Sequence, residues 1–277
     1  GMAGSMAAIA AAREGARVLL VEEEGYLGGS LTACGTGPMM TFYAGEKQVI
    51  RGLTDELIRR LVDKGLSPGH IPDSTGYTYT VTPFDAEGLK RELEQMVQES
   101  GASLLFHSSI IAVQKEGKRL EKVTIASCGT VMEMEAKCFI DATGDADLVA
   151  IAGIPFEQGR EKDGKDQPMT MNLKLDHVDI DTVRHLMDTD IRLFPLLSKQ
   201  PGLQHKASRL SCSGFVEAME KGIADGELTF DREIDLFFET DTKNEVVGNM
   251  TRGSGEDPVG PWSITQAETE GRRQAWE

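Results

Sequence analysis

The sequence lacks the cysteine pattern of a metal site, a disulfide framework or a secreted domain. Its four cysteines lie far apart, form no C-x-x-C pair and follow no secretory signal. Cysteines spaced in this way favour neither zinc ligation nor a set of stapling disulfides. We therefore expect no metal site and a reducing, cytoplasmic location.

Long apolar runs and basic residues are also scarce. The longest apolar runs, such as Met6–Ala12, are far shorter than the roughly 20 residues that a membrane span requires. The formal net charge is −16, with 45 acidic and 29 basic residues, so a phosphate backbone is a poor partner. What remains is a globular chain of 277 residues, long enough for one large domain or two ordinary ones.

The first residues predict half of a strand–helix–strand unit. Gly4–Glu14 is rich in alanine and indicates a helix that stops at Gly15, and Arg17–Glu22 indicates a short buried strand. Lys137–Ala142 has the same buried-strand pattern, so we expect both strands in one central, mostly parallel sheet. The strand that should precede the helix is missing.

The rest of the chain alternates between helical and antiparallel patterns. We expect helices at 52–64, from Asp85 to Gly101, at 183–187 and at 215–221, and strands at 103–107, 110–114, 120–126, 131–135, 169–175 and within 228–238. The pattern of predicted helices and strands changes near Gly159. This change predicts two domains, 1–158, with a polar excursion at about 43–82, and 159–277.

Three short motifs indicate a nucleotide crevice. Gly1-Met2-Ala3-Gly4 would supply the last two glycines of G-x-G-x-x-G, the turn that places a pyrophosphate over a helix N-terminus. Glu22 ends the next strand, about 20 residues after the fingerprint begins, where an acid can accept hydrogen bonds from a ribose. Gly28-Gly29 permits close backbone approach, and the small residues of Ala142–Asp145 leave room at the end of a strand.

Each motif also has a simpler interpretation. The glycines at the start could serve a tightly packed helix, Glu22 could be a solvated strand end beside Glu23 and Glu24, and Gly28-Gly29 could be an ordinary turn. The motifs gain weight from their order along the chain. That order is carried by AGSMAAIAAAREGARVLLVE, YLGGSLTACGTGPM, VTPFDAEGLKRELEQM, CFIDATGDADLVAIAG, QPMTMNLKL and TQAETEGRRQ.

Together these stretches resemble the FAD-dependent oxidoreductases with a glutathione-reductase-like flavin fold, including bacterial FAD-dependent dehydrogenases, over nearly the whole chain. The resemblance implies an α/β fold with a Rossmann-like central parallel sheet, an inserted antiparallel piece and a second α+β domain. Residues 1–158 would then bind FAD, and 159–277 would form a substrate or cap domain. The family also continues at both ends beyond this sequence, so we expect a truncated chain that holds FAD weakly or not at all.

The resemblance also implies a set of cofactor-binding residues. The helix start would hold the pyrophosphate, the acid the ribose, the loop 28–32 would run toward the flavin, and the strand near Val113 would meet the adenine. The set is Gly1, Gly4, Ser5, Glu22, Gly28, Gly29, Ser30, Thr32, Val113, Ala142, Thr143, Gly144 and Asp145.

The function implied is oxidation of a small organic substrate by FAD. Two alternatives stay open: an NAD(P)-dependent dehydrogenase, since half a fingerprint cannot identify the dinucleotide, and a non-catalytic module that keeps the scaffold. Cys34 could approach the flavin, and His70 and His107 could transfer protons, but single residues without a visible partner favour structural or surface roles. Arginines at positions 160, 252, 272 and 273 could bind an anionic substrate, although solvated surface charges are the simpler interpretation. No catalytic residue is assigned, and the substrate and oligomeric state stay open.

Overall fold

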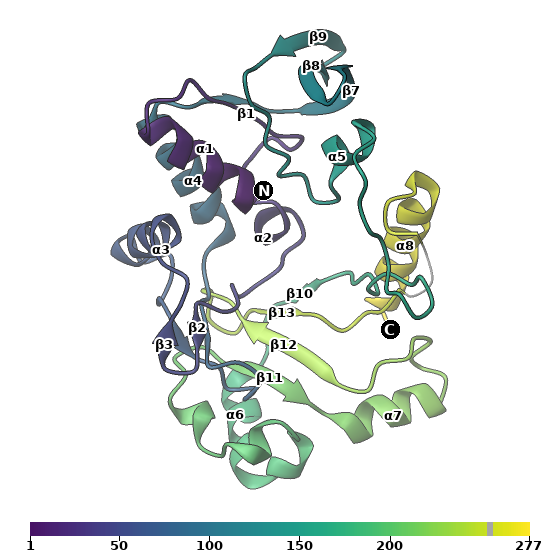
Figure 1. The fold of residues 1–277 in the computed structure, drawn as a ribbon. Coiled ribbons are helices and arrows are strands. Elements are labelled where there is room, and N and C mark those ends of the chain that lie inside the picture. The colour runs from purple at the N-terminus through teal and green to yellow at the C-terminus, as the bar shows by residue number, and fades with distance from the viewer. Residues whose placement is uncertain (254–256) are drawn as a thin grey trace. The chain divides into compact units, whose positions relative to one another are not determined.

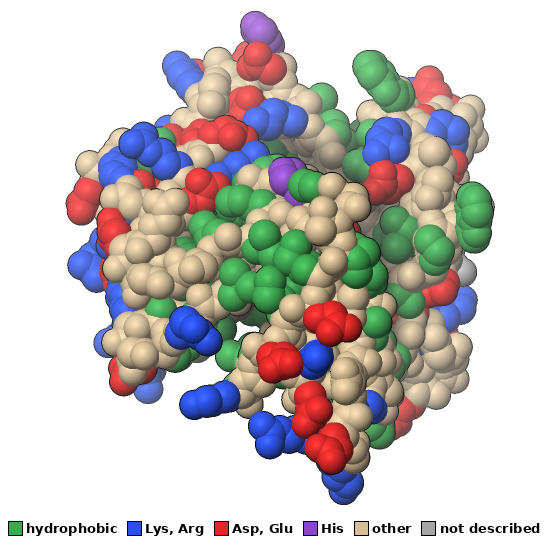
Figure 2. All heavy atoms as spheres, turned by 90° about the horizontal axis from the view of Figure 1, so that it is seen from above, with side chains coloured by type: hydrophobic (Ala, Val, Ile, Leu, Met, Phe, Trp, Pro, Cys, Tyr) green, Lys and Arg blue, Asp and Glu red, His purple; other side chains and the backbone are tan. Residues whose placement is uncertain are grey.

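The computed structural model describes residues 1–253 and 257–277, which form two compact units (Figure 1). Unit 1 comprises Gly1–Ala33 and Leu89–Gln158, and unit 2 comprises Cys34–Gly88 and Gly159–Glu277. Among these residues, no helix combines the length and the apolar content that a bilayer crossing would need. On the face drawn in Figure 2, basic side chains are interspersed with acidic ones.

Unit 1 contains a parallel strand pair, a three-stranded antiparallel sheet and several helices. Its elements are α1 (Met2–Arg13), β1 (Leu19–Val21), α2 (Ser30–Ala33), most of α4 (Ala86–Ser100), β6 (Ser103–Leu105), β7 (Ser108–Glu116), β8 (Arg119–Ser127), β9 (Thr130–Glu135) and α5 (Asp147–Ile151). The predicted helix at the start of the chain and the antiparallel piece are therefore confirmed.

Strand β1 pairs in parallel with β6, from Leu19 opposite Ser103 to Val21 opposite Leu105. A parallel pair needs a crossover connection, and α4 lies on that connection. Helix α1 is built from small residues, of which Ala8 is buried beside the fully buried Ile9. Alanine is the best helix former, and its small side chain also allows close packing.

The antiparallel sheet β7-β8-β9 forms one apolar cluster of unit 1. Val123 and Ile125 of β8 are buried with Leu148 of α5, and partly buried residues from β1 and β6 pack against them. Gly117 and Gly129 have φ values of +58° and +77°, which a hairpin turn requires and glycine adopts without strain.

Two predictions for the central sheet were wrong. Lys137–Ala142 is not a strand, because within the described residues no strand forms a hydrogen-bond ladder with it. Ile140 in this segment is 63% exposed. Strand β1 is also less buried than its apolar sequence indicated: Leu19 is 42% exposed, since β6 is the one strand that pairs with β1 in the described part of the chain.

Unit 2 is built around a four-stranded antiparallel sheet in the order β10-β13-β12-β11. Its strands are β10 (Leu173–Leu175), β11 (Ser211–Gly214), β12 (Asp235–Glu239) and β13 (Val246–Gly248), with the short pairs β2 (Tyr43–Ala44), β3 (Lys47–Gln48), β4 (Ile71–Pro72) and β5 (Thr80–Val81). Its helices are α3 (Leu53–Asp63), α6 (Ile180–Thr189), α7 (Val216–Ala224) and α8 (Pro261–Gln274), with 3-10 turns at Ile191–Leu193, Leu197–Lys199 and Leu203–His205. The predicted sheet containing 169–175 is confirmed through β10.

The two sequence segments of unit 2 are joined by buried hydrogen bonds. Ser74 Oγ donates to the carbonyl oxygen of Ser211 at 2.6 Å and accepts from the Ser211 amide at 2.7 Å. Asp73 shapes the loop that carries Ser74, since its carboxylate accepts hydrogen bonds from the Thr75 and Thr78 amides. The polar loop of residues 73–79 is thereby attached to β11.

Candidate cofactor site at the start of helix α1

Helix α1 begins without a side-chain cap. Gly1 occupies the N-cap position, no side chain accepts a hydrogen bond from the first turn, and no acidic residue lies in that turn. The first N–H groups of a helix have no partner within the helix, and the helix dipole makes this end positive. The start of α1 therefore offers backbone donors to an anion.

A second glycine segment lies directly against this helix start. The Cβ of any side chain at Gly29 would lie 2.9 Å from the Cα of Gly1, and Gly29 has a φ of +59°. Gly28 has a φ of +119°, and a Cβ there would clash with Thr32 at 2.5 Å. Thr32 is itself fixed, because its hydroxyl donates to the Leu27 carbonyl at 2.8 Å. Glycine is thus required where the two backbones meet.

Glu22 faces the same point from the carboxyl end of β1. Its Oε2 accepts a hydrogen bond from the N-terminal ammonium group of Gly1 at 2.8 Å, and its Oε1 accepts one from the Glu24 amide at 3.2 Å. The Glu22 side chain is 11% exposed. Its own amide continues the pairing of β1 with β6 by donating to the Leu105 carbonyl at 2.9 Å. The carboxylate is therefore held beside the start of α1.

Gly4 brings Ala142 to the same helix. A Cβ at Gly4 would lie 3.3 Å from the Cβ of Ala142 and 3.4 Å from a methyl carbon of Leu20. These distances leave little room for a larger residue at Gly4. Ser5, next along the helix, is fully buried and donates its hydroxyl to the Gly1 carbonyl at 3.0 Å.

Asp141 organises the turn that follows, and the sequence analysis did not single it out. Its Oδ1 accepts hydrogen bonds from the Thr143 amide at 3.0 Å and hydroxyl at 2.7 Å, and its Oδ2 accepts one from the Val149 amide at 2.9 Å. Burial raises the pKa of Asp141, but these hydrogen bonds outweigh it and hold the pKa below its usual value. The Thr143 hydroxyl also accepts from the Asp147 amide at 2.8 Å.

The predicted site residues do not all meet at one point. Contacts around the start of α1 bring together Gly1, Gly4, Ser5, Glu22, Gly28, Gly29, Thr32 and Ala142. Ser30 begins α2 and is exposed, as are Thr143, Gly144 and Asp145. Val113 lies opposite Val123 within the β7–β8 pair, and its side chain packs on the apolar core of unit 1.

Val113 also lies well along the strand from Glu22. The Ser108 amide, at the start of β7, donates to the Glu22 carbonyl at 3.0 Å. Val113 follows five residues later, which is about 16 Å along a strand. The structure therefore gives no contact that joins Val113 to the residues at the start of α1.

The histidines considered for proton transfer lie elsewhere. His107 is exposed, with its ring against Gly25. His70 lies in unit 2, where its Nδ1 is 2.7 Å from the Thr82 hydroxyl and its ring is tilted against Phe42. Burial lowers the pKa of His70, although nearby Asp55 opposes this effect. Neither histidine touches the start of α1 through a described contact.

The chain has relatives of known family and structure. Residues 1–277 match the family model described as FAD dependent oxidoreductase. The chain belongs to this family. FAD is therefore the cofactor of the family, which favours FAD over the nicotinamide alternative, and the expected resemblance is confirmed.

Several solved flavoenzymes share the fold. A geranylgeranyl bacteriochlorophyll reductase-like protein from Thermoplasma acidophilum is similar with a TM-score of 0.52 and 12% identity, over 98% of this chain and 58% of that chain. The glycerol-3-phosphate dehydrogenase from Bacillus halodurans, solved with FAD, is similar with a TM-score of 0.50 and 14% identity, over 99% and 50%. The flavin-dependent monooxygenase PieE, solved with FAD and substrate, is similar with a TM-score of 0.50 and 14% identity. The match covers 98% of this chain and 45% of that chain.

These likenesses show an α/β FAD-binding fold. The chain spans about half the length of these structures, between 45% and 58%. A comparison with curated protein sequences found no match.

Proposed function

We propose that unit 1 binds the ADP portion of FAD at the start of α1, and that the chain serves the FAD-dependent oxidation of a small organic molecule. The observation that carries this proposal is the meeting of Glu22 and Gly29 at Gly1. FAD, when bound, supplies the hydride-transfer redox chemistry. Family membership supports the choice of cofactor.

The residues at the helix start fit a dinucleotide. The uncapped amides of the first turn can donate to pyrophosphate oxygens, and the glycines at positions 1 and 29 let the backbone approach them closely. Glu22 can accept hydrogen bonds from ribose hydroxyls, because a carboxylate has about four acceptor sites and two are used here. Gly4 allows the helix to pack on Leu20 and Ala142.

The remaining predicted contacts are part of the proposal. Ser30 and Thr32 follow the glycine pair, and we assign them to the path toward the flavin. Asp141 holds the loop of Thr143, Gly144 and Asp145 in a fixed turn beside Ala142, where it can bound the cofactor. A backbone contact between Val113 and adenine stays a prediction.

We assign cofactor binding to residues 1–158 and substrate recognition to 159–277. The substrate class expected is a small organic molecule. No residue is assigned a catalytic role: among the described contacts at the start of α1, Glu22 is the one ionisable side chain, and the Ser5 hydroxyl donates to the Gly1 carbonyl. The expected cytoplasmic location also stays a prediction.

The test is a titration of the 15N-labelled full chain with FAD and, separately, with ADP, which carries the adenosine and pyrophosphate alone. Both ligands should shift the amide resonances of the first turn of α1 and of Gly29. Glu22→Gln removes the carboxylate charge but keeps the shape, and should weaken both ligands by about tenfold or more, since hydrogen bonds to charged groups contribute about 1.5–3 kcal/mol.

Glu24→Gln is the matched control, because Glu24 is an exposed acid two residues away. It should leave both affinities unchanged. Shifts confined to other parts of the chain, or equal affinities for Glu22→Gln and the wild type, would show that the start of α1 is not the dinucleotide site. Thermal melting without ligand checks that Glu22→Gln is folded.

A further inference from the structure

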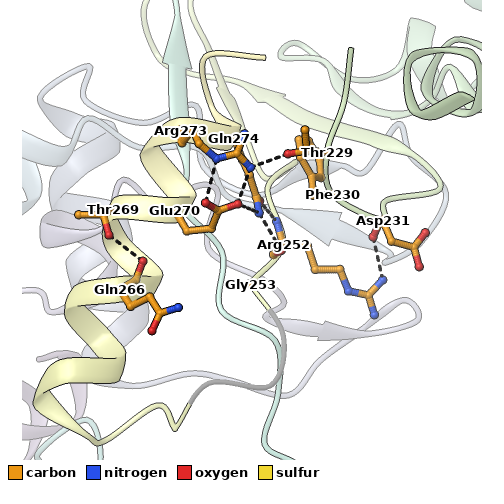
Figure 3. A pocket seen from close by; sticks show the side chains of 10 residues that line it. All are labelled: Thr229, Phe230, Asp231, Arg252, Gly253, Gln266, Thr269, Glu270, Arg273 and Gln274. Carbon is orange, nitrogen blue, oxygen red and sulfur yellow. Dashed lines mark hydrogen bonds and ion pairs between the residues drawn. The ribbon is translucent and has the colours of Figure 1, made fainter. Parts of the chain in front are cut away.

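Unit 2 contains a pocket of about 590 Å³ within residues 159–277, the part of the chain to which we assign substrate recognition (Figure 3). Three chain segments line it: residues 229–231, residues 252 and 253, and one face of α8. A volume of this size is within the range of small-molecule sites. Phe230 gives the pocket an apolar wall and is buried, with 7% of its surface exposed.

The two arginines in the pocket differ in how their charges are compensated. Arg273 of α8 donates to Glu270 and Glu277 and to the Thr229 hydroxyl, and Figure 3 shows it against Glu270 and Thr229. Arg252 extends instead toward Asp231, where its guanidinium donates to the main-chain carbonyl at 3.4 Å. Arg252 is exposed, and no carboxylate of the described residues forms an ion pair with it.

A second cation lies near Arg252. Arg232 is half-buried and donates to the Asn249 carbonyl at 2.7 Å. Burial and the charge of Arg252 lower the pKa of Arg232, whereas the carboxylate of Asp235 acts in the opposite direction. Neither Arg232 nor Arg252 forms an ion pair with a carboxylate among the described residues, in a chain with 45 acidic and 29 basic residues. Because Asp235 already acts on Arg232, Arg252 is the cation of this pair that is available to an anion.

The other polar groups of the pocket limit which anion fits. The hydroxyls of Thr229 and Thr269 already donate to or accept from protein groups, whereas the side-chain amide of Gln266 has no hydrogen bond among the described residues. Glu270 and Asp231 are also among the residues that line the pocket, and their negative charges would disfavour a multiply charged anion. One negative charge on an apolar body therefore matches Arg252, Gln266 and Phe230.

We propose that this pocket binds a small organic monocarboxylate, with the carboxylate at Arg252 and the apolar body against Phe230. The guanidinium can hold a carboxylate through two parallel hydrogen bonds. Gln266 can donate a further hydrogen bond from α8. The site lies wholly within unit 2, so it does not depend on the FAD proposal.

Calorimetric titration of the full chain with benzoate tests this site. Benzamide, which has the same ring but no charge, is the matched ligand, and inorganic phosphate is the competing anion. Benzoate should bind at least about tenfold more tightly than benzamide, as expected for a charge-assisted pair. Arg252→Gln should remove that difference, and Gln266→Leu should weaken benzoate severalfold.

Arg272→Gln is the control variant, since Arg272 is an exposed arginine of the same helix that pairs with Glu268 outside the pocket. It should bind benzoate as the wild type does. Folding of Arg252→Gln is expected to persist, because Gln274 binds the main-chain amide and carbonyl of Arg252 rather than its side chain. If Arg252→Gln does not fold, Gln266→Leu alone decides.

Three outcomes would overturn the proposal. They are an absence of benzoate binding to the wild type, an unchanged benzoate affinity in Arg252→Gln or Gln266→Leu, and phosphate binding that is tighter than benzoate binding. The last result would indicate a site for inorganic anions.

Discussion

Asp235, the first residue of β12, should make the stability of the protein depend on pH. Its Oδ1 is buried and has no hydrogen-bond partner among the described residues. Burial raises the pKa of this carboxyl from 3.8 to about 6, although Arg232 acts in the opposite direction. Because the pKa of Asp235 is higher in the folded state than in the unfolded state, its protonated carboxyl favours folding. This contribution to the free energy of unfolding is complete below the unfolded-state pKa and is lost as the pH rises through about 6.

The size of the effect follows from the shift. Two pKa units correspond to about 3 kcal/mol of free energy of unfolding lost at neutral pH. Integrating between about pH 4.5 and about pH 7.5 gives a change of about 2 kcal/mol. Asp235→Asn keeps the size of the side chain and cannot ionise, so it should lack this loss.

The assay is urea unfolding of the wild type and Asp235→Asn at both pH values. The stability of Asp235→Asn relative to the wild type should rise by about 2 kcal/mol from the lower to the higher pH. Groups such as His70 titrate in both proteins and cancel in the difference. Glu233→Gln, an exposed acid two residues away, is the control and should show no such change. A constant difference between Asp235→Asn and the wild type would refute the reasoning.

Three further predictions concern single residues. Gly29→Ala should destabilise the protein by about 1–3 kcal/mol in urea unfolding, because its φ is +59° and a Cβ would lie 2.9 Å from the Cα of Gly1. Gly35 has a similar φ of +62° but no atom within 4 Å of an added Cβ, so Gly35→Ala should lower the stability less. Asp85→Ala should lower the free energy of unfolding by about 1 kcal/mol in the same measurement, because the Asp85 carboxylate accepts a hydrogen bond from an amide in the first turn of α4. Asp85→Asn keeps an acceptor oxygen there and should retain most of the stability. His70 should titrate by NMR with a midpoint below 6.5, since burial lowers its pKa. Neutral His70 therefore contributes to the stability of the folded state, and this contribution should be lost as the pH falls from 6.5 through the folded-state pKa. A midpoint at or above 6.5 would contradict this prediction.

Local signals in the sequence were sufficient for most elements. The helix after Asp85 could be predicted because an acid at that position caps the first turn and Gly101 ends the helix. The strands β7 to β9 could be predicted because alternation and turn residues report on neighbouring strands that lie close in sequence. Such patterns depend on residues only a few positions apart.

What the sequence analysis missed depends on distant partners. The apolar segment Lys137–Ala142 has the composition of a buried strand, but a strand also needs a neighbouring strand to bond with, and composition does not report that. Asp141 was missed because its role lies in hydrogen bonds to Thr143 and Val149; the aspartate two residues before a threonine was the available signal. The sequence offered Arg252 as a possible ligand for an anionic substrate, but the pocket around it combines three chain segments and has no local signature.

The hydrogen bonds between Ser74 and Ser211 have a consequence for synthesis on the ribosome. They join residues 137 positions apart, so the segment 34–88 cannot complete unit 2 until β11 has left the exit tunnel. Unit 1, which ends at Gln158, is by then fully synthesised. Because domains fold as units during synthesis, we expect unit 1 to fold first, with residues 34–88 held as an unfinished insertion that waits for its partner strands.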